Sequence, residues 1–282
     1  MNSIEINNLS KKYKDFSLEN ISFSLPSGTI LGLVGENGAG KSTIINLIMN
    51  TISRDSGTVK VLDIDNKSKD FIETKQDIGV VLDEACFPEI ITPNIVNKVM
   101  KNTYKNWNED CYFKYIKRFN LPTDKKFKDF SKGMKMKLPI AVALSHDSKL
   151  LILDEATVGL DPMVRDEILD IFNEFTLDET HSVLISSHII SDLEKICDYI
   201  AFIHKGKLLF CEEKDRLLEE YAIVKVSPSA FEAIPKEAVK GVKTGKYGME
   251  VLVIKSMISS AFIPEHTNLE DIILFLAKEE NV

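Results

Sequence analysis

A glycine-rich run near residue 40 has the residue types and the spacing that bind phosphate. Gly35-Glu36-Asn37-Gly38-Ala39-Gly40-Lys41-Ser42 matches the spacing G-x-x-x-x-G-K-[ST]. Its glycines let backbone N–H groups curve around phosphate oxygens, Lys41 can reach the β- and γ-phosphates, and Ser42 offers a hydroxyl group to Mg²⁺. The run therefore predicts a site for a nucleoside triphosphate, with an ordinary glycine turn as the alternative.

Two adjacent acids in the middle of the chain supply the second part of such a site. Asp154 and Glu155 directly follow the apolar run Leu150–Leu153, which is typical of a buried strand. A strand that ends there delivers Asp154 toward Mg²⁺ and lets Glu155 polarise the attacking water as a general base. The start of an ordinary loop would look the same in isolation, and the phosphate-binding run favours the site.

A histidine follows a third apolar run. His188 ends the segment Ile185-Ser186-Ser187-His188, so a buried strand would place its imidazole where it can hydrogen-bond a γ-phosphate. A single histidine after a strand is usually structural. The functional interpretation is favoured here because the glycine-rich run, the acidic pair, Asp161 and the histidine succeed one another along the chain.

The elements around these residues alternate between strands and helices. Thr29–Val34 is nearly continuously apolar, which is typical of a strand buried on both faces, and Lys41–Asn50 has apolar residues at helical spacing. Further short apolar strands are expected at Leu150–Leu153, Ser182–Ser186 and Tyr199–Ile203. Because helical segments separate them, the pattern predicts an α/β fold with a parallel sheet.

Three other segments differ from that alternation. Residues 3–62 open with alternating strands, which predicts an N-terminal antiparallel β subdomain, and residues 88–145 have the texture of an inserted helical subdomain. Beyond residue 214 we expect a small C-terminal α+β appendage. The expected division is therefore one domain over residues 1–214 and an accessory domain over residues 215–282.

The appendage is predicted from two β-like runs and one helix. The runs are Ala222–Val226 and Met249–Ile254. Thr267-Asn268-Leu269-Glu270 has the pattern of a capping box that opens an apolar helix from Asp271 to Lys278.

Composition excludes several classes of protein. The 282 residues include 35 basic and 43 acidic side chains, a formal net charge of −8, and 44% of the residues are apolar, as in globular proteins. Apolar runs such as Ile272–Ala277 are far shorter than the roughly 18 residues of a membrane span, and Met1–Asn8 has no signal-peptide pattern. An acidic chain is not expected to bind nucleic acid non-specifically, and four cysteines without C-x-x-C spacing indicate reduced cytosolic thiols.

On these motifs the chain resembles the nucleotide-binding subunits of ATP-binding-cassette (ABC) transporters, over about residues 3–210. The resemblance implies a P-loop NTPase core that binds and hydrolyses ATP with Mg²⁺, with Lys41, Glu155 and His188 as catalytic residues and Ser42 and Asp154 at the metal. Glu155 is the implied base and His188 the switch histidine. The loop residues implied to hold the nucleotide are Asn37, Gly38, Ala39, Gly40, Lys41, Ser42 and Thr43.

The signature sequence, which is the family's hallmark, has a partial match in Phe130-Ser131-Lys132-Gly133-Met134. Ser131 and Gly133 are kept and are implied to contact nucleotide, whereas Lys132 and Met134 replace a glycine and a glutamine. Similar forms occur in the drug and peptide exporter branch of the family. The resemblance also implies that Tyr13 stacks on adenine.

Two positions depart from the family pattern. Asp83 follows the expected strand Ile78–Leu82 where the family usually has a glutamine, and its carboxylate is expected near Mg²⁺. Pro139 falls within the helix that should follow the signature, where it removes one backbone hydrogen bond and favours a kink.

The resemblance also implies partners. In this family two cassettes face each other, and each ATP lies between the Walker A loop of one and the signature of the other. One chain carries one cassette, so a second ABC ATPase chain, identical or related, is implied together with a membrane-spanning transporter subunit. The chain would be cytoplasmic, peripheral at the inner face of the cell membrane, and would drive export of a peptide or antibiotic. No nucleic acid partner is expected.

Two alternatives compete with a transporter subunit. A soluble ABC ATPase acting on the ribosome or on DNA would usually carry two cassettes or a long coiled-coil insertion, whereas only 107 residues separate Ser42 from Leu150 here. A GTP switch would need an Asn-Lys-x-Asp motif, which the sequence lacks.

Charge is concentrated in the expected helical insertion. Residues 98–137 contain twelve basic and four acidic side chains, a balance of +8. Such a segment predicts a basic face toward an anionic membrane leaflet or acidic loops of the membrane subunit, with an ordinary solvated helical face as the alternative.

Overall fold

The computed structural model describes residues 1–83, 87–245 and 248–279. Its strands are β1 (Asn2–Lys12), β2 (Ser17–Pro26), β3 (Ile30–Val34), β4 (Ser56–Val61), β5 (Ile64–Asp65), β6 (Ile78–Val81), β7 (Leu150–Asp154), β8 (Ser182–Ser187), β9 (Tyr199–His204), β10 (Lys207–Glu213), β11 (Tyr221–Val226), β12 (Val239–Gly245) and β13 (Gly248–Ile254). Its helices are α1 (Lys41–Ile48), α2 (Phe71–Thr74), α3 (Pro93–Thr103), α4 (Glu109–Arg118), α5 (Lys132–Ala143), α6 (Pro162–Phe175), α7 (Ile190–Ile196), α8 (Lys214–Glu220), α9 (Pro228–Phe231) and α10 (Leu269–Glu279).

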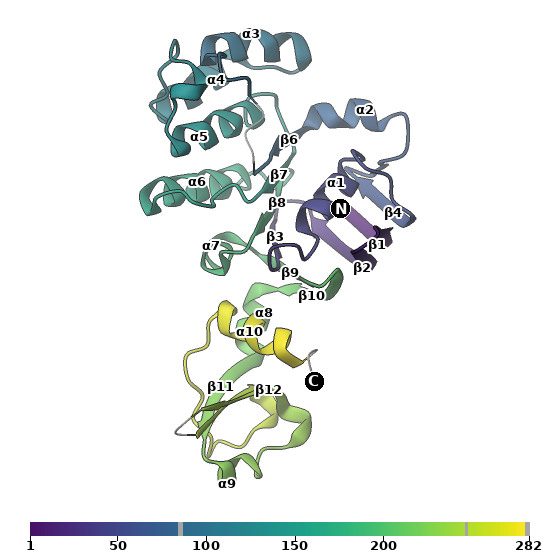
Figure 1. Cartoon of the computed structure of the whole chain (residues 1–282), viewed down its shortest axis with the longest axis vertical. Coiled ribbons are helices and arrows are strands. Elements are labelled where there is room, and N and C mark those ends of the chain that lie inside the picture. The colour runs from purple at the N-terminus through teal and green to yellow at the C-terminus, as the bar shows by residue number, and fades with distance from the viewer. Residues whose placement is uncertain (84–86, 246–247, 280–282) are drawn as a thin grey trace.

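The strands form two sheets. The larger has ten strands in the order β5-β4-β1-β2-β10-β9-β3-β8-β7-β6, and the smaller has three in the order β11-β13-β12. Figure 1 shows the larger sheet and its helices in the upper part of the molecule, with the smaller sheet below it. The predicted α/β class is confirmed.

The first strands form the antiparallel end of the large sheet. β1 pairs antiparallel with both β2 and β4, so that Ile6 lies between Phe23 and Val59. All three side chains are buried, because alternate residues of a strand point to the same face of the sheet. This end of the sheet matches the antiparallel β subdomain predicted for residues 3–62.

The parallel strands form the centre of the molecule. Every residue of β3, β7 and β8 is buried, as expected for parallel strands covered by helices on both faces. α1 contributes Ile44 to the core on one face, and α6 and α7 contribute Ile168 and Leu193 to the core on the other. β10 was not predicted, since its apolar residues show no alternation. It pairs antiparallel with β9 and joins β2 through Lys207 and Glu19.

The inserted helices α3, α4 and α5 lie within residues 88–145, as predicted. Each begins with a capping side chain on the preceding residue, because an Asn, Ser or Thr oxygen satisfies a free N–H group of the first turn. These caps are Thr92, Asn108 and Ser131. α5 continues as one helix across Pro139, whose side chain is buried in the core beneath it.

The C-terminal appendage contains one strand more than predicted. β11 and β13 correspond to the predicted runs, and both pair antiparallel within the small sheet. The additional strand β12 pairs with the other edge of β13. The sequence of β12 has lysine and glycine where a strand usually alternates apolar residues, so it did not predict a strand. Hydrogen bonding to β13 holds this segment in the sheet.

The predicted capping box at the last helix is wrong by one residue. α10 begins at Leu269, and the side chain of Asn268 caps it by accepting the N–H of Asp271 at 2.8 Å. The Thr267 hydroxyl group instead accepts the N–H of Ile223 in β11 at 2.9 Å. A contact with a distant strand therefore overrides the local pattern.

Across the described residues, every helix is too short or too polar to cross a lipid bilayer.

Candidate active site

Three neighbouring strands end at the edge of the sheet where the predicted site residues lie. β8 lies between β3 and β7 and runs parallel to both. The glycine-rich loop (residues 35–40) leaves this edge from β3, Glu155 leaves it from β7, and His188 leaves it from β8. Open α/β sheets bind ligands at this edge, because the carboxyl ends of their parallel strands meet there.

The glycine-rich loop has a backbone that only glycine tolerates. Gly38 and Gly40 have φ angles of +84° and +115°, in the left-handed region. A Cβ atom at Gly40 would lie 2.6 Å from the side chain of Leu18. α1 then begins at Lys41 without a side-chain cap, so its first N–H groups point toward the loop, as an anion site requires.

The carboxylate of Glu155 lies between Lys41 and His188. Glu155 Oε1 is 3.1 Å from Lys41 Nζ, and Glu155 Oε2 is 2.9 Å from His188 Nδ1. Lys41 Nζ also donates to the carbonyl oxygen of Gly35 at 2.7 Å. The Lys41 and Glu155 side chains are 6% and 11% exposed, so water and salt screen their ion pair weakly. Of the three residues predicted as catalytic, Glu155 therefore contacts each of the other two.

Ser186 fixes the backbone and side chain of the acidic pair. Its hydroxyl group donates to Asp154 Oδ1 at 2.5 Å, and it accepts the N–H of Glu155 at 3.1 Å. Glu155 has a φ angle of +52°, an uncommon conformation that this hydrogen bond helps to hold. The sequence placed Ser186 beside the histidine without assigning it a role; a polar residue inside an apolar strand was the available signal.

Asp154 suits a magnesium ligand. It is 5% exposed, and among the described residues its side chain pairs with no lysine or arginine. A buried carboxylate without a cation is costly. The described residues contain no group of three His, Cys, Asp or Glu side chains able to hold a metal alone. Mg²⁺ is commonly held by one or two carboxylates together with substrate phosphates, and Asp154 and the Ser42 hydroxyl group offer such ligands.

The other predicted nucleotide contacts differ in exposure. Asn37 and Ser42 are exposed, Thr43 is half-buried, and Ala39 is buried. The ring of Tyr13 is 43% exposed and has Lys11 Nζ 5.6 Å from its centroid. The contact of these residues with ATP stays a prediction.

The signature residues lie at the start of α5, away from the strand ends. Ser131 caps α5 by accepting the N–H of Met134 at 3.3 Å, and a Cβ atom at Gly133 would lie 3.6 Å from Val164 in α6. The side chain of Lys132 crosses Gly159, where an added Cβ atom would come within 2.0 Å of Lys132 Nζ. The nucleotide contact of Ser131 and Gly133 stays a prediction that concerns a second chain.

Asp83 lies just beyond β6. Its side chain is exposed, and it makes no ion pair with the described part of the chain. Its place near Mg²⁺ stays a prediction, and the neighbouring Glu84 and Cys86 lie outside the described residues.

Sequence reasoning missed a buried polar network next to the site. Thr157 Oγ1 donates to Asp192 Oδ2 at 2.8 Å, and Arg165 Nη1 lies 3.6 Å from Asp192 Oδ1. Three single polar residues, far apart along the chain, gave no motif that could have revealed it.

The cysteines that the structure describes are free thiols with weak reactivity. Burial raises the pKa of the Cys211 thiol to about 11 and raises the pKa of Cys197 further. Both therefore stay protonated near neutral pH. The expectation that the cysteines are reduced cytosolic thiols stays a prediction.

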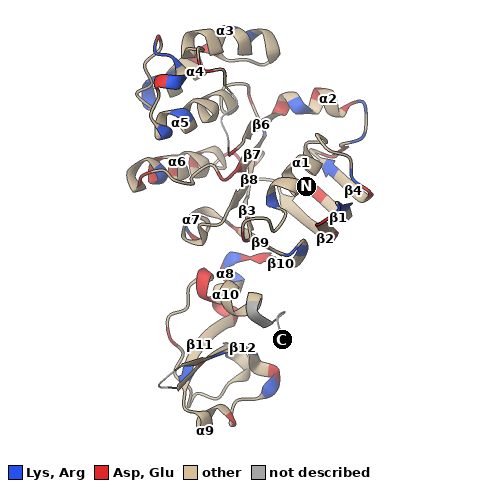
Figure 2. Cartoon of the chain, viewed as in Figure 1, with Lys and Arg blue, Asp and Glu red and all other residues tan. Residues whose placement is uncertain are grey.

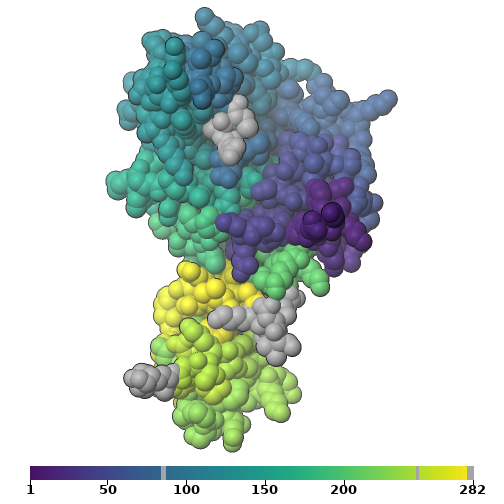
Figure 3. Space-filling model, viewed as in Figure 1, coloured from purple at the N-terminus to yellow at the C-terminus, as the bar shows by residue number. Residues whose placement is uncertain are grey.

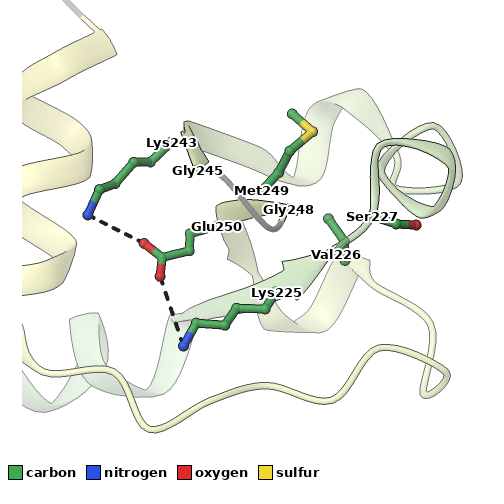
Figure 4. Close-up of a pocket in the computed structure, with 8 residues that line it drawn as sticks. All are labelled: Lys225, Val226, Ser227, Lys243, Gly245, Gly248, Met249 and Glu250. Carbon is green, nitrogen blue, oxygen red and sulfur yellow. Dashed lines mark ion pairs between the residues drawn. The ribbon is translucent and has the colours of Figure 1, made fainter.

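A hollow of about 560 Å³ lies on the small sheet, far from these residues along the chain. Its two lysines, Lys225 and Lys243, lie 3.9 Å and 3.5 Å from the carboxylate of Glu250 between them (Figure 4). Lys225 also pairs with Glu265 at 2.8 Å. Because carboxylates already neutralise both lysines, this hollow is not a second triphosphate site.

The parallel sheet, the phosphate loop and the acids at the strand ends define a P-loop nucleoside triphosphatase. A family model described as "ABC transporter" matches residues 18–158. The lantibiotic transport ATP-binding protein SrtF of Streptococcus pyogenes is 35% identical over 215 residues, which cover 75% of this chain and 91% of SrtF. The chain therefore belongs to the ABC transporter family, as its ATP-binding, ATP-hydrolysing component.

Two further comparisons agree. The bacitracin transport ATP-binding protein BcrA of Enterococcus faecalis is 31% identical over 209 residues, which cover 73% of this chain and 68% of BcrA. A solved ATP-binding subunit of an ABC transporter superposes with a TM-score of 0.67 and 27% identity, covering 76% of this chain and 91% of its own. The resemblance found in the sequence motifs is thus confirmed at the level of family and fold.

Proposed function

We propose that this chain hydrolyses ATP to drive export of a peptide antibiotic through a separate membrane-spanning subunit. Hydrolysis is supported by the position of the Glu155 carboxylate, which lies between Lys41 and His188 beside the phosphate loop. Export and cargo are supported by the relatives, since SrtF is named for lantibiotic transport and BcrA for bacitracin transport.

The phosphate loop binds the substrate. Its backbone N–H groups and the start of α1 hold the phosphates of ATP, and Lys41 contacts the β- and γ-phosphates. Tyr13 offers an exposed ring for adenine. Ser42 and Asp154 hold Mg²⁺, which neutralises charge on the phosphates when it is bound.

Glu155 then acts as the general base. As Lys41 moves its hydrogen bonds to phosphate oxygens, Glu155 Oε1 becomes free to accept a proton from the attacking water. His188 keeps its contact with Glu155 Oε2 and can turn a ring N–H toward the γ-phosphate. The strained backbone of Glu155, held by Ser186, keeps the carboxylate aimed at the loop.

Complete activity needs a second cassette. Ser131 and Gly133 lie at the start of α5, in the helical insertion, and make no hydrogen bond to the phosphate loop within the described chain. They complete the ATP site of a partner chain, identical or related, and the membrane-spanning subunit couples the closing of the pair to transport. In this proposal the chain works in the cytoplasm, at the inner face of the membrane. Residues 1–214 are its ATPase domain and residues 215–282 its accessory domain.

The test is reconstitution. The chain is purified with a candidate polytopic membrane protein, sought in the neighbouring reading frames, and placed in vesicles. ATP turnover and movement of a labelled lantibiotic are then measured. We expect both to occur together and to be lost in Lys41→Met. ATP turnover stimulated by ribosomes or DNA, and not by the membrane protein, would favour the soluble ABC ATPase instead.

A further inference from the structure

A buried carboxylate outside the proposed catalytic trio links two segments of the site. Asp192 is 3% exposed and lies in the first turn of α7. It accepts the Thr157 hydroxyl group at 2.8 Å and pairs with Arg165 across 3.6 Å. These two partners compensate for the burial of the carboxylate, which is costly when a buried charge has no partner.

The network closes a ring around the site. Thr157 follows Glu155 by two residues, and Asp192 follows His188 by four. The Glu155–His188 contact of 2.9 Å joins these two segments at one end, and the Thr157–Asp192 hydrogen bond joins them at the other. The position of His188 against Glu155 therefore depends on two contacts, the direct one and the hydrogen bond between Thr157 and Asp192.

Arg165 extends the ring to the turn before α6. Its Nη2 donates to the carbonyl oxygen of Leu160 at 3.3 Å, and its Nε is buried without a hydrogen-bond partner among the described residues. The next residue, Asp161, caps α6 by accepting the N–H of Val164. The turn of residues 157–161 is thus fastened to α7 through Asp192.

We propose that Asp192 is a positioning residue for ATP hydrolysis, which holds His188 against Glu155 by tying the 157–161 turn to α7. It acts through Thr157 and Arg165 and does not touch the substrate. The inference rests on the proposed function, in which Glu155 is the base and His188 contacts the γ-phosphate. If a second cassette displaced the turn of residues 157–161, the contacts of Asp192 with Thr157 and Arg165 would shift α7 and with it His188.

An exposed ion pair between the same two helices provides a matched control. Lys195 of α7 and Asp166 of α6 pair at 3.0 Å, and their side chains are 60% and 63% exposed. Surface pairs of this kind contribute little to stability or geometry. Lys195→Gln therefore removes a tie between α6 and α7 without disturbing the buried ring.

The experiment compares Thr157→Val, Thr157→Ser, Asp192→Asn and Lys195→Gln in the full chain, with and without His188→Ala. ATP turnover, the Kd for ATP and the Tm are measured. We expect Thr157→Val and Asp192→Asn to lower kcat by about tenfold to a hundredfold, as a displaced catalytic group does, with the Kd for ATP little changed. Thr157→Ser keeps the hydroxyl group and should stay within about twofold of the parent, as should Lys195→Gln.

The His188→Ala background separates positioning from general stability. If Asp192 acts through His188, Thr157→Val lowers kcat no further in that background, because coupled residues are not additive. The inference would be overturned if Thr157→Val lowered kcat in the His188→Ala background by the same factor as in the parent. It would also be overturned if kcat fell in proportion to Tm across all variants. Should Thr157→Val unfold, Asp192→Asn decides by the same criteria. A His188→Ala variant with parental turnover would contradict the proposed role of His188, whereas loss in His188→Ala with no effect of Thr157→Val would contradict only the role of Asp192.

Discussion

Lys41 Nζ lies 3.1 Å from Glu155 Oε1, so the lysine of the phosphate loop is ion-paired with the carboxylate placed to act as base. In the mechanism proposed above, both groups act elsewhere during turnover: the ammonium at the phosphates and the carboxylate at the attacking water. The arrival of phosphate therefore frees the base at the moment when the substrate is in place. In this mechanism, the ion pair of Lys41 with Glu155 links phosphate binding to activation of the base.

Glu155→Gln tests the base. The amide keeps the shape of the side chain and cannot take a proton, so we expect turnover to fall by about 10²–10⁴-fold. The Kd for ATP should be equal to or lower than that of the parent, because Lys41 loses its ionic partner, and a closed dimer should accumulate. Turnover within about threefold of the parent would show that another group is the base.

Asp83→Gln tests the metal environment. If the carboxylate lies near Mg²⁺, the amide should shift the Mg²⁺ concentration for half-maximal ATP turnover, because the neutral oxygen attracts the ion less strongly. Titration of both proteins with Mg²⁺ at saturating ATP measures the shift. If the two Mg²⁺ titration curves superimpose, Asp83 does not lie near the metal.

His146 predicts a pH dependence of stability. It is fully buried against the ring of Tyr104, 3.9 Å away, and Nδ1 bonds the carbonyl oxygen of Gln76. Burial lowers the pKa of His146 below its usual 6.5, although Asp77 and Asp147 act in the opposite direction. The unfolded chain then binds more protons below pH 6.5, so the free energy of unfolding falls as the pH drops through that value.

Replacement of this imidazole removes the effect. His146→Phe keeps the stacked ring and cannot titrate, so its Tm should change less between about pH 7.5 and 5.5 than that of the parent. His266→Gln, at an exposed position, is the control and should keep the parental slope. Equal slopes for His146→Phe and the parent would assign the dependence to other groups.

The basic face of the helical insertion is smaller than its sequence suggests. Lys101 pairs with Glu109 at 2.7 Å and Lys105 pairs with Glu73, whereas Lys114 and Lys117 are exposed and make no ion pair with the described residues. In Figure 2 the ribbon is blue, the colour of Lys and Arg, at several places along α4 and α5.

Charge reversal separates the two pairs of lysines. Lys114→Glu with Lys117→Glu should weaken binding to phosphatidylglycerol vesicles by roughly fivefold per lysine at low salt, and less at high salt. Lys101→Glu with Lys105→Glu is the matched control and should have a smaller effect, since carboxylates already neutralise those lysines. If neither variant changes vesicle binding, the basic face is an ordinary solvated surface and does not bind the membrane.

The residues of the site could be predicted because local patterns place them. Gly40, Asp154 and His188 each follow or precede an apolar run whose length and period identify a buried strand or helix, and parallel strands bring their ends together. The ion pair of Lys41 with Glu155 could not be predicted, because it depends on side-chain directions that no spacing encodes.

The remaining differences come from contacts between distant segments. β12 is held by β13, and Thr267 is drawn from its expected capping role by β11. Asp192, Thr157 and Arg165 meet from three separate elements. Each depends on tertiary packing, which overrides the local propensity of a short segment.

α10 packs against α7, the helix that follows His188. Leu269 of α10 donates its N–H to Glu194 of α7 at 3.1 Å, and Leu269 lies in the same apolar core as Leu193 and Ile196. Figure 3 shows these C-terminal residues against the lower edge of the larger part. During synthesis α7 is made before α10, so its apolar face stays uncovered until α10 can pack against it. Without α10, the apolar side chains of Leu193 and Ile196 would lose part of their cover and expose the kind of surface that chaperones and proteases recognise.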